Sequence, residues 1–281
     1  MSVASDRDDV LAKLLAAAGE AAVIVMRIYG EEDMGTQMKG PNDPVTRADK
    51  EANALILDRL QRDLPGVPIV AEESDPSTFA GFGNAREALF VDPVDGTRDF
   101  IAKDGEFAVM IGFAEEGRAT VGVVLCCALG QTFTGVEGRG AFVIDDAGKS
   151  TPIRVDTNTD LTQARVAVSR FHRSKRVDAK LATLGARELV PVGSAGLKAV
   201  RVASAELQLY AHPSSGKVKL WDACGPDAIV RAAGGVLTDA RGTFFDYRGT
   251  VEQGLGTLAA HPVLHAEALA RFAAYDAANP A

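Results

Sequence analysis

The chain of 281 residues is long enough for one large domain or two modest ones, and its 47% hydrophobic and 24% charged residues are typical of globular proteins. The formal net charge of −8 argues against a general nucleic-acid-binding surface, and no apolar stretch reaches the roughly 18 residues of a membrane span. We therefore expect neither a nucleic-acid nor a membrane partner. The N-terminus lacks a secretory signal, and three cysteines, an odd and low number, suit a cytoplasmic location.

The first part of the chain, residues 1–150, is predicted to combine helices with an antiparallel sheet. Apolar residues at helical spacing over 10–26 predict one long helix. A second helix is predicted to begin with Thr46 as its cap and Asp49 in its first turn. The turn 115–118 predicts a hairpin between two strands. The predicted strands cover residues 67–71, 88–91, 107–113, 120–127 and 132–136.

The second part, residues 151–281, alternates strands with helices, which indicates layered α/β structure. No low-complexity linker separates it from the first part, so we expect the two parts to share one interface. The densest basic segment, residues 170–176, leaves room for one local anion site. The predicted strands cover 165–169, 188–192, 207–211 and 236–239, and the predicted helices cover 175–184, 196–204, 222–233 and 262–276.

Carboxylates follow two of the predicted strands and begin one predicted helix. Asp92 and Asp95 end one strand. Glu72 ends another, and Asp222 begins a helix. Strand ends are where mixed folds present ligands, and a divalent cation relieves the repulsion among gathered carboxylates. All-oxygen ligation suits Mg²⁺, and two such ions side by side promote in-line phosphoryl displacement.

Each of these acids also has an ordinary structural interpretation. Asp-Pro and Asp-Gly pairs are common in turns, so Asp92 and Asp95 taken alone are explained equally well as turn residues. Asp222 taken alone is better explained as a helix cap. We expect Glu73 and Asp99 to be solvated surface acids.

Three segments of the chain, in the correct order, resemble the signature segments of the inositol monophosphatase superfamily. They are residues 72–74 (EES), 92–97 (DPVDGT) and 221–223 (WDA). Within that superfamily the chain is most similar to the 3′(2′),5′-bisphosphate nucleotidases. This closer similarity lies in residues 95–101 (DGTRDFI), 105–107 (GEF), 169–172 (SRFH), 193–198 (GSAGLK) and 219–222 (KLWD).

The resemblance implies a fold and an activity. The implied fold is mixed α+β, the layered α-β-α-β-α sandwich of the sugar phosphatases. The implied activity is Mg²⁺-dependent removal of the 3′-phosphate of 3′-phosphoadenosine 5′-phosphate, and a homodimer is compatible with it. An inositol monophosphatase or sugar bisphosphatase with the same metal chemistry remains an alternative. A non-catalytic binding or regulatory module is disfavoured, because every ligand position carries a competent residue.

The resemblance also implies which residues hold the metal ions. Glu72, Asp92 and Asp95 would hold the first ion, together with the backbone carbonyl of Val94. Asp95 and Asp222 would hold the second ion. Both ions are expected to be Mg²⁺, with water and a substrate phosphate completing their coordination.

The resemblance further assigns the water and the substrate contacts. Asp49 and Thr97 would orient and deprotonate the attacking water, and the amides of Gly96 and Thr97 would cradle the phosphate. The rest of a nucleotide would be contacted by four residues, Ser169, His172, Ser194 and Lys198. From the residues alone, His172 is explained nearly as well as a surface histidine, and Lys198 as a solvated helix lysine.

Overall fold

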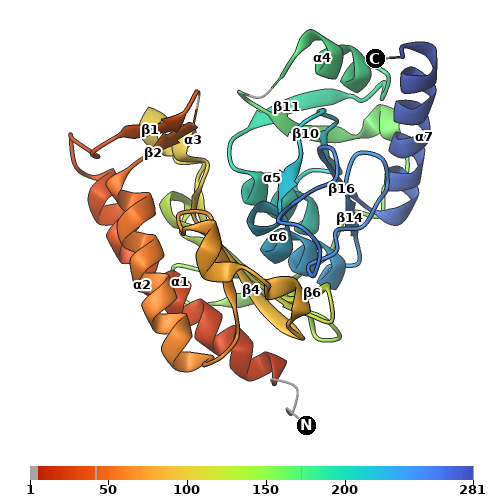
Figure 1. Cartoon of the computed structure of the whole chain (residues 1–281). Coiled ribbons are helices and arrows are strands. Elements are labelled where there is room, and N and C mark those ends of the chain that lie inside the picture. Colours follow the sequence, from red (N-terminus) through yellow and green to blue (C-terminus); the bar gives the residue numbers. More distant parts are fainter. Residues whose placement is uncertain (1–5, 42, 172, 281) are drawn as a thin grey trace.

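The computed structural model describes residues 6–41, 43–171 and 173–280, which form five alternating layers of helix and sheet (Figure 1). The first layer contains the paired helices α1 (Arg7–Tyr29) and α2 (Arg47–Asp63). Thr46 caps α2, and the Asp49 side chain accepts the Thr46 backbone N–H at 2.7 Å, which closes a capping box. The predicted start of this helix is confirmed.

The second layer is a seven-stranded sheet whose strand order follows the chain. Its strands are β3 (Ile69–Ala71), β4 (Glu87–Asp95), β5 (Ala108–Glu115), β6 (Arg118–Cys126), β7 (Gln131–Val136), β8 (Gly140–Asp145) and β9 (Ser150–Ile153). Neighbouring strands are antiparallel except β3 and β4, which run parallel. Ala71, the last residue of β3, pairs with Val91 of β4, so the segment that follows β3 leaves the sheet beside the final residues of β4. The Glu72 N–H donates to the Val91 carbonyl at 3.1 Å.

The middle layer contains α5 (Ala195–Ala203) and α6 (Leu220–Ala232), which lie between the two sheets (Figure 1). Gly112, Gly122 and Gly135 stand side by side on neighbouring strands of the first sheet. A Cβ on Gly112 would lie 2.5 Å from the Gly225 nitrogen, and one on Gly122 would lie 2.2 Å from the Gly225 oxygen. This row of glycines lets α6 approach the sheet closely, which sets the position of Asp222.

The fourth layer is a five-stranded mixed sheet in the order β11-β10-β12-β16-β14. Its strands are β10 (Arg165–Ser169), β11 (Glu188–Val192), β12 (Leu209–His212), β14 (Val236–Thr238) and β16 (Thr257–Ala260). Two helices, α4 (Lys175–Ala182) and α7 (Pro262–Ala278), form the fifth layer. Each junction between layers encloses buried apolar side chains, so the core is distributed between all five layers.

Shorter elements connect the layers. They are the strand pair β1 (Gln37–Gly40) and β2 (Asp43–Val45), the strand pair β13 (Val218–Lys219) and β15 (Glu252–Gln253), the helix α3 (Thr97–Ala102), and the 3₁₀ turns η1 (Pro76–Phe79), η2 (Phe82–Asn84), η3 (Cys127–Leu129) and η4 (Leu161–Gln163).

The predicted fold class is confirmed: the chain is a mixed α+β protein with the layered fold. Strand β4 runs four residues further than the predicted strand 88–91, because it continues through an irregularity between Asp92 and Asp95. The division near residue 150 stays a prediction. Among the described residues, no helix is both long and apolar enough to cross a membrane.

Candidate active site

The end of β4 carries the first two predicted metal ligands. Asp92 is 2% exposed and Asp95 is 8% exposed, so both carboxylates are removed from bulk water. The strand register shifts between them, and the Asp92 side chain accepts the Val94 N–H at 3.0 Å. The turn interpretation is therefore correct for the Asp92 side chain. It does not account for the burial of both acids, because turn carboxylates are ordinarily solvated.

The turn after β4 brings a threonine hydroxyl to a buried acid. Gly96 has φ +90°, and a Cβ there would lie 3.0 Å from the Glu106 carbonyl, so only glycine fits. Directly after it, the Thr97 hydroxyl donates to Asp49 Oδ1 at 3.1 Å. Asp49 is 1% exposed, and burial raises the pKa of its carboxyl. A left-handed glycine turn and a helix start thus place together two residues that are 48 positions apart.

Glu72 and Glu73 lie beside the same edge of the sheet and share one cation. Lys39 Nζ lies 2.8 Å from Glu72 Oε1 and 2.6 Å from Glu73 Oε1. The Glu73 side chain is only 6% exposed. Our expectation of a solvated surface acid is therefore wrong for Glu73, because an ion pair with the β1 lysine compensates its burial.

Asp222 lies in the first turn of α6, beyond the capping position. The N-cap residue is Lys219, which makes no side-chain capping bond. Burial raises the pKa of Asp222 well above its usual value, and the charges of Asp95 and Glu72 raise it further. The helix-cap interpretation is thus wrong for Asp222, which instead lies near the other predicted metal ligands.

The predicted ligand acids are electrostatic neighbours. Burial raises the pKa of Asp92, and the charges of Glu72, Asp95 and Asp222 raise it further, in that order. Such a set of crowded, buried carboxylates is unfavourable unless positive charge is added. Its donor atoms are all oxygen, which is the ligand chemistry that Mg²⁺ prefers. The residues present therefore fit the predicted cation.

Some of these acids already accept hydrogen bonds from other groups of the chain. Asp95 accepts the Ser194 hydroxyl, the Ala195 N–H at 3.0 Å and the Gly196 N–H at 2.7 Å. Glu72 is engaged by Lys39. Within the described ranges, no three His, Cys, Asp or Glu side chains form a ready metal-binding group.

A cavity of about 1250 Å³ opens beside the acids. Asp95, Thr97 and Asp222 line one part of it. The predicted substrate contacts Ser169, Ser194 and Lys198 line another part, whereas His172 lies outside the described residues. The wall beyond them is rich in cations: Arg98, Arg170, Arg173, Arg176, Lys180, Lys217 and Arg241.

Lys198 is buried, with 5% of its surface exposed. Its Nζ donates to the carbonyls of Val192 at 3.3 Å, Gly193 at 3.0 Å and Ser194 at 2.7 Å. Burial lowers its pKa to about 8. The interpretation as a solvated helix lysine is wrong, because its ammonium group holds together the turn before α5. Ser194, with the rare φ of +43°, lies in that turn.

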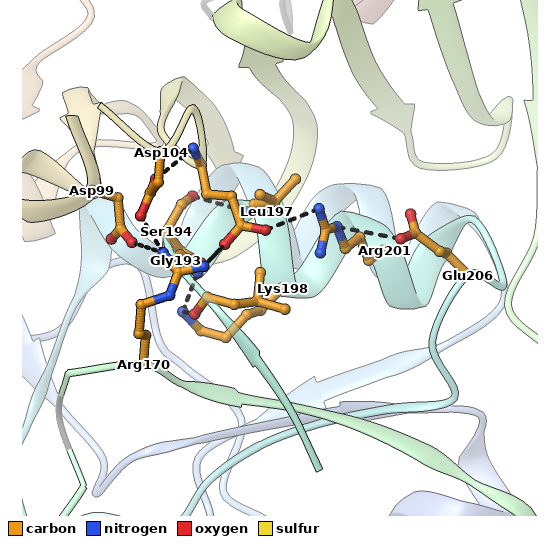
Figure 2. A network of polar contacts seen from close by, with 11 residues as sticks. Asp99, Asp104, Arg170, Gly193, Ser194, Leu197, Lys198, Arg201 and Glu206 are labelled. Carbon is orange, nitrogen blue, oxygen red and sulfur yellow. Dashed lines mark hydrogen bonds and ion pairs between the residues drawn. The ribbon is translucent and has the colours of Figure 1, made fainter. Parts of the chain in front are cut away.

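Arg170, from the predicted basic segment, forms ion pairs with three acids of the first part, as Figure 2 shows for Asp99 and Asp104. The third acid is Glu106, which also accepts the Gly193 N–H at 2.8 Å. Asp99 is 3% exposed, so the expectation of a solvated acid is wrong here too. Burial and the nearby Asp104 raise the pKa of Asp99 to about 6, although Arg170 acts in the opposite direction.

Sequence reasoning did not assign Glu106, although residues 105–107 were part of the resemblance. The acidic side chains between 99 and 106 could have been matched with the basic segment 170–176 by their opposite charges. Nothing in the sequence shows which acid meets which cation.

The layered fold and its buried acids are those of a phosphatase. The profile of the Inositol monophosphatase family matches residues 6–277, and the chain belongs to this family. It is similar to the 3′(2′),5′-bisphosphate nucleotidase CysQ of Escherichia coli, at 32% identity over 85% of this chain and 93% of that protein. It is also similar to the histidinol-phosphatase of Mycobacterium tuberculosis, at 30% identity over 94% of this chain and 97% of that protein.

The solved structures agree on the fold. The extragenic suppressor protein suhB from Bartonella henselae superposes with a TM-score of 0.81 at 24% identity, covering 94% of this chain and 98% of that one. Together these similarities show that the chain is a phosphomonoester hydrolase of a family whose members are typically metal-dependent. Its substrates are small phosphate esters.

Proposed function

We propose that this enzyme is a 3′(2′),5′-bisphosphate nucleotidase that removes the 3′-phosphate of 3′-phosphoadenosine 5′-phosphate with Mg²⁺. The observation that carries the proposal is the single cavity that runs from the acids to the cationic wall. A substrate with two phosphates can place one at the acids and the other beside the cations. A cytoplasmic location belongs to the same proposal and is supported by the three free cysteines.

The metal chemistry in this proposal comes from the gathered acids. Glu72, Asp92, Asp95 and the Val94 carbonyl would hold one Mg²⁺, and Asp95 with Asp222 would hold another. When bound, these ions polarise the phosphoryl group and lower the pKa of water at the site. The acids thereby keep the reacting phosphate beside Thr97.

Proton transfer in this proposal belongs to two side chains. The Thr97 hydroxyl, which donates to Asp49 at 3.1 Å, can accept a proton from the attacking water while passing its own to Asp49. Burial raises the pKa of Asp49, which makes its carboxylate a better proton acceptor than a solvated aspartate. Thr46 holds the second oxygen of Asp49 with its N–H and its hydroxyl, so the acceptor is oriented.

Substrate contacts complete the proposal. The amides of Gly96 and Thr97 would bind the reacting phosphate, and Ser169 and Ser194, which also line the cavity, would contact the rest of the nucleotide. Direct contact by Lys198, which the resemblance implies, is not part of this proposal and stays untested. In this structure its N–H groups are donated to the turn that carries Ser194.

Phosphate release from a small panel of substrates tests the proposal. The panel contains 3′-phosphoadenosine 5′-phosphate, inositol 1-phosphate, fructose 1,6-bisphosphate and histidinol phosphate, each with and without Mg²⁺. We expect the highest kcat/KM for the nucleotide, and activity only with the cation. A preference for inositol 1-phosphate, the sugar bisphosphate or histidinol phosphate would replace the nucleotidase assignment and leave the phosphatase assignment in place.

A further inference from the structure

The cavity wall contains an aromatic ring that has no role in the proposed chemistry. Phe171 lines the cavity, and 43% of its surface is exposed. Among the described residues, the only other phenylalanine with such exposure is Phe244 at 64%, and it does not line the cavity. Leaving this much of an aromatic side chain in contact with water costs free energy that a planar ligand would recover by covering it.

The position of Phe171 relates it to the proposed reaction centre. The Arg98 guanidinium lies 5.6 Å from the centroid of the Phe171 ring. Arg98 directly follows Thr97 in the chain. Only the Arg98 side chain therefore separates the Phe171 ring from the backbone of Thr97, whose hydroxyl is proposed to take the proton of the attacking water. A substrate with its reacting phosphate beside Thr97 would therefore bring its neighbouring groups close to this ring.

The residue before Phe171 is firmly anchored, as Figure 2 shows for Arg170 and its partners. Arg170 pairs with Asp99, Asp104 and Glu106, so its charge is already neutralised and it is a poor ligand for a further phosphate. Glu106 in turn pairs with Arg201 of α5 at 3.1 Å. These contacts tie the backbone before Phe171 to both parts of the chain, and such pre-organisation lowers the entropy cost of binding.

We propose that Phe171 is the platform on which the nucleobase of the substrate stacks. That the substrate has a base follows from the proposed function, on which this inference rests. The base is the part of the substrate that this wall would recognise. The Arg98 guanidinium beside the ring adds a planar cation, which also stacks on bases. Discrimination between a nucleotide and other phosphate esters then depends on an aromatic surface as well as on charge.

The decisive variants are Phe171→Ala, Phe171→Trp and, as a matched control, Phe244→Ala. Each is assayed with 3′-phosphoadenosine 5′-phosphate and with ribose 3,5-bisphosphate, which keeps both phosphates and lacks the base. Loss of one base–aromatic stack corresponds to roughly a 5- to 150-fold effect. We expect Phe171→Ala to lower kcat/KM for the nucleotide within this range, mainly through KM, and to leave the base-free substrate unchanged.

The other variants separate stacking from a structural role. Phe171→Trp should retain nucleotide activity because it keeps an aromatic face, and Phe244→Ala should behave as the wild type. Equal losses on both substrates for Phe171→Ala would overturn the proposal, since they would show a structural role. An unchanged nucleotide kcat/KM would also overturn it.

A binding measurement keeps this inference separate from the proposed function. Calorimetry with adenosine 5′-monophosphate and with ribose 5-phosphate requires no turnover. We expect Phe171→Ala to weaken binding of the first ligand roughly 5- to 150-fold and to leave the second unchanged. If the wild type does not hydrolyse the nucleotide, the proposed function is wrong. Stacking is then supported by base-dependent binding at Phe171 and refuted by its absence.

Discussion

The cavity has an acidic wall, which includes Asp95 and Asp222, and a cationic wall, and the two differ in how their charges are compensated. On the acidic wall, burial and mutual repulsion raise the pKa values of Asp92 and Asp222, so this wall needs added positive charge. On the cationic wall, Arg170 is neutralised by three carboxylates, and the neighbouring Lys198 donates to backbone carbonyls. A charged residue in a cavity wall therefore contributes to binding only as far as its own neighbours leave its charge uncompensated.

The largest expected effect comes from removing one negative charge from the acidic wall. We expect Asp95→Asn to abolish phosphatase activity, by on the order of 10³-fold or more, because it would weaken both metal sites while the protein stays folded. Phosphate release over a range of Mg²⁺ concentrations measures the loss, and circular dichroism checks the fold. The matched control is Asp145→Asn, an exposed acid at the end of β8. Normal turnover of Asp95→Asn at limiting Mg²⁺ would contradict the assignment.

The second largest effect concerns proton transfer. Thr97→Ala should lower kcat by roughly 10²- to 10⁴-fold and change KM much less, because the hydroxyl acts mainly in the transition state. Asp49→Asn should behave similarly. Steady-state kinetics of the double variant then test the pairing, since two residues of one relay should not give additive losses. Additive losses would show that the two side chains act separately.

A third test concerns the cationic wall. Lys198→Met removes the donor that holds the Val192, Gly193 and Ser194 carbonyls, so it should lower the free energy of unfolding by about 1–3 kcal/mol. Because the whole turn loosens, kcat/KM should fall by similar factors for a bisphosphate and a monophosphate substrate. Denaturant unfolding and kinetics measure the two effects. A loss confined to the bisphosphate, with unchanged stability, would instead make Lys198 a direct phosphate contact.

The smallest effect on activity concerns a buried acid outside the cavity, Asp227 of α6. Tyr247 donates to it at 3.0 Å, and its other oxygen has no hydrogen-bond partner among the described residues. Burial raises its pKa to about 7, against the opposing effects of Arg231 and Tyr247. The folded state therefore retains a proton that the unfolded state releases, so stability should decrease as pH rises from about 4 to about 7 and then level off.

The variant Asp227→Asn isolates this contribution. It should remove the decrease in the free energy of unfolding between about pH 4 and about pH 7. That decrease amounts to a few kcal/mol, because one pKa unit corresponds to about 1.4 kcal/mol. Activity should change little, because Asp227 does not line the cavity. Chemical denaturation at several pH values provides the measurement. An unchanged pH–stability profile would mean that the pKa of Asp227 is not raised in the folded protein. Burial alone would then not explain the raised pKa values of Asp92 and Asp222 on the acidic wall.

Local patterns predicted most of the secondary structure. The helices α1, α2, α5, α6 and α7 were expected from apolar periodicity and capping residues, which act between near neighbours in the chain. The strands β8, β9 and β16 were not expected. β9 is largely exposed, β8 is mostly half-buried, and β16 is a short buried run that pairs with β12 and β14, distant in sequence. Their pairing therefore depends on the assembled sheet more than on their own residues.

The order and type of the acids, and with them the expected all-oxygen chemistry, could be predicted from the chain alone, because Glu72, Asp92 and Asp95 come at the ends of recognisable strands. Which charges are buried, and which partners compensate them, became visible only in the folded protein. Asp99 meets Arg170 across 71 residues of chain, which made a predicted surface acid a buried one. The physical reason is that desolvation and ion pairing depend on distances in space, and sequence separation does not report those distances.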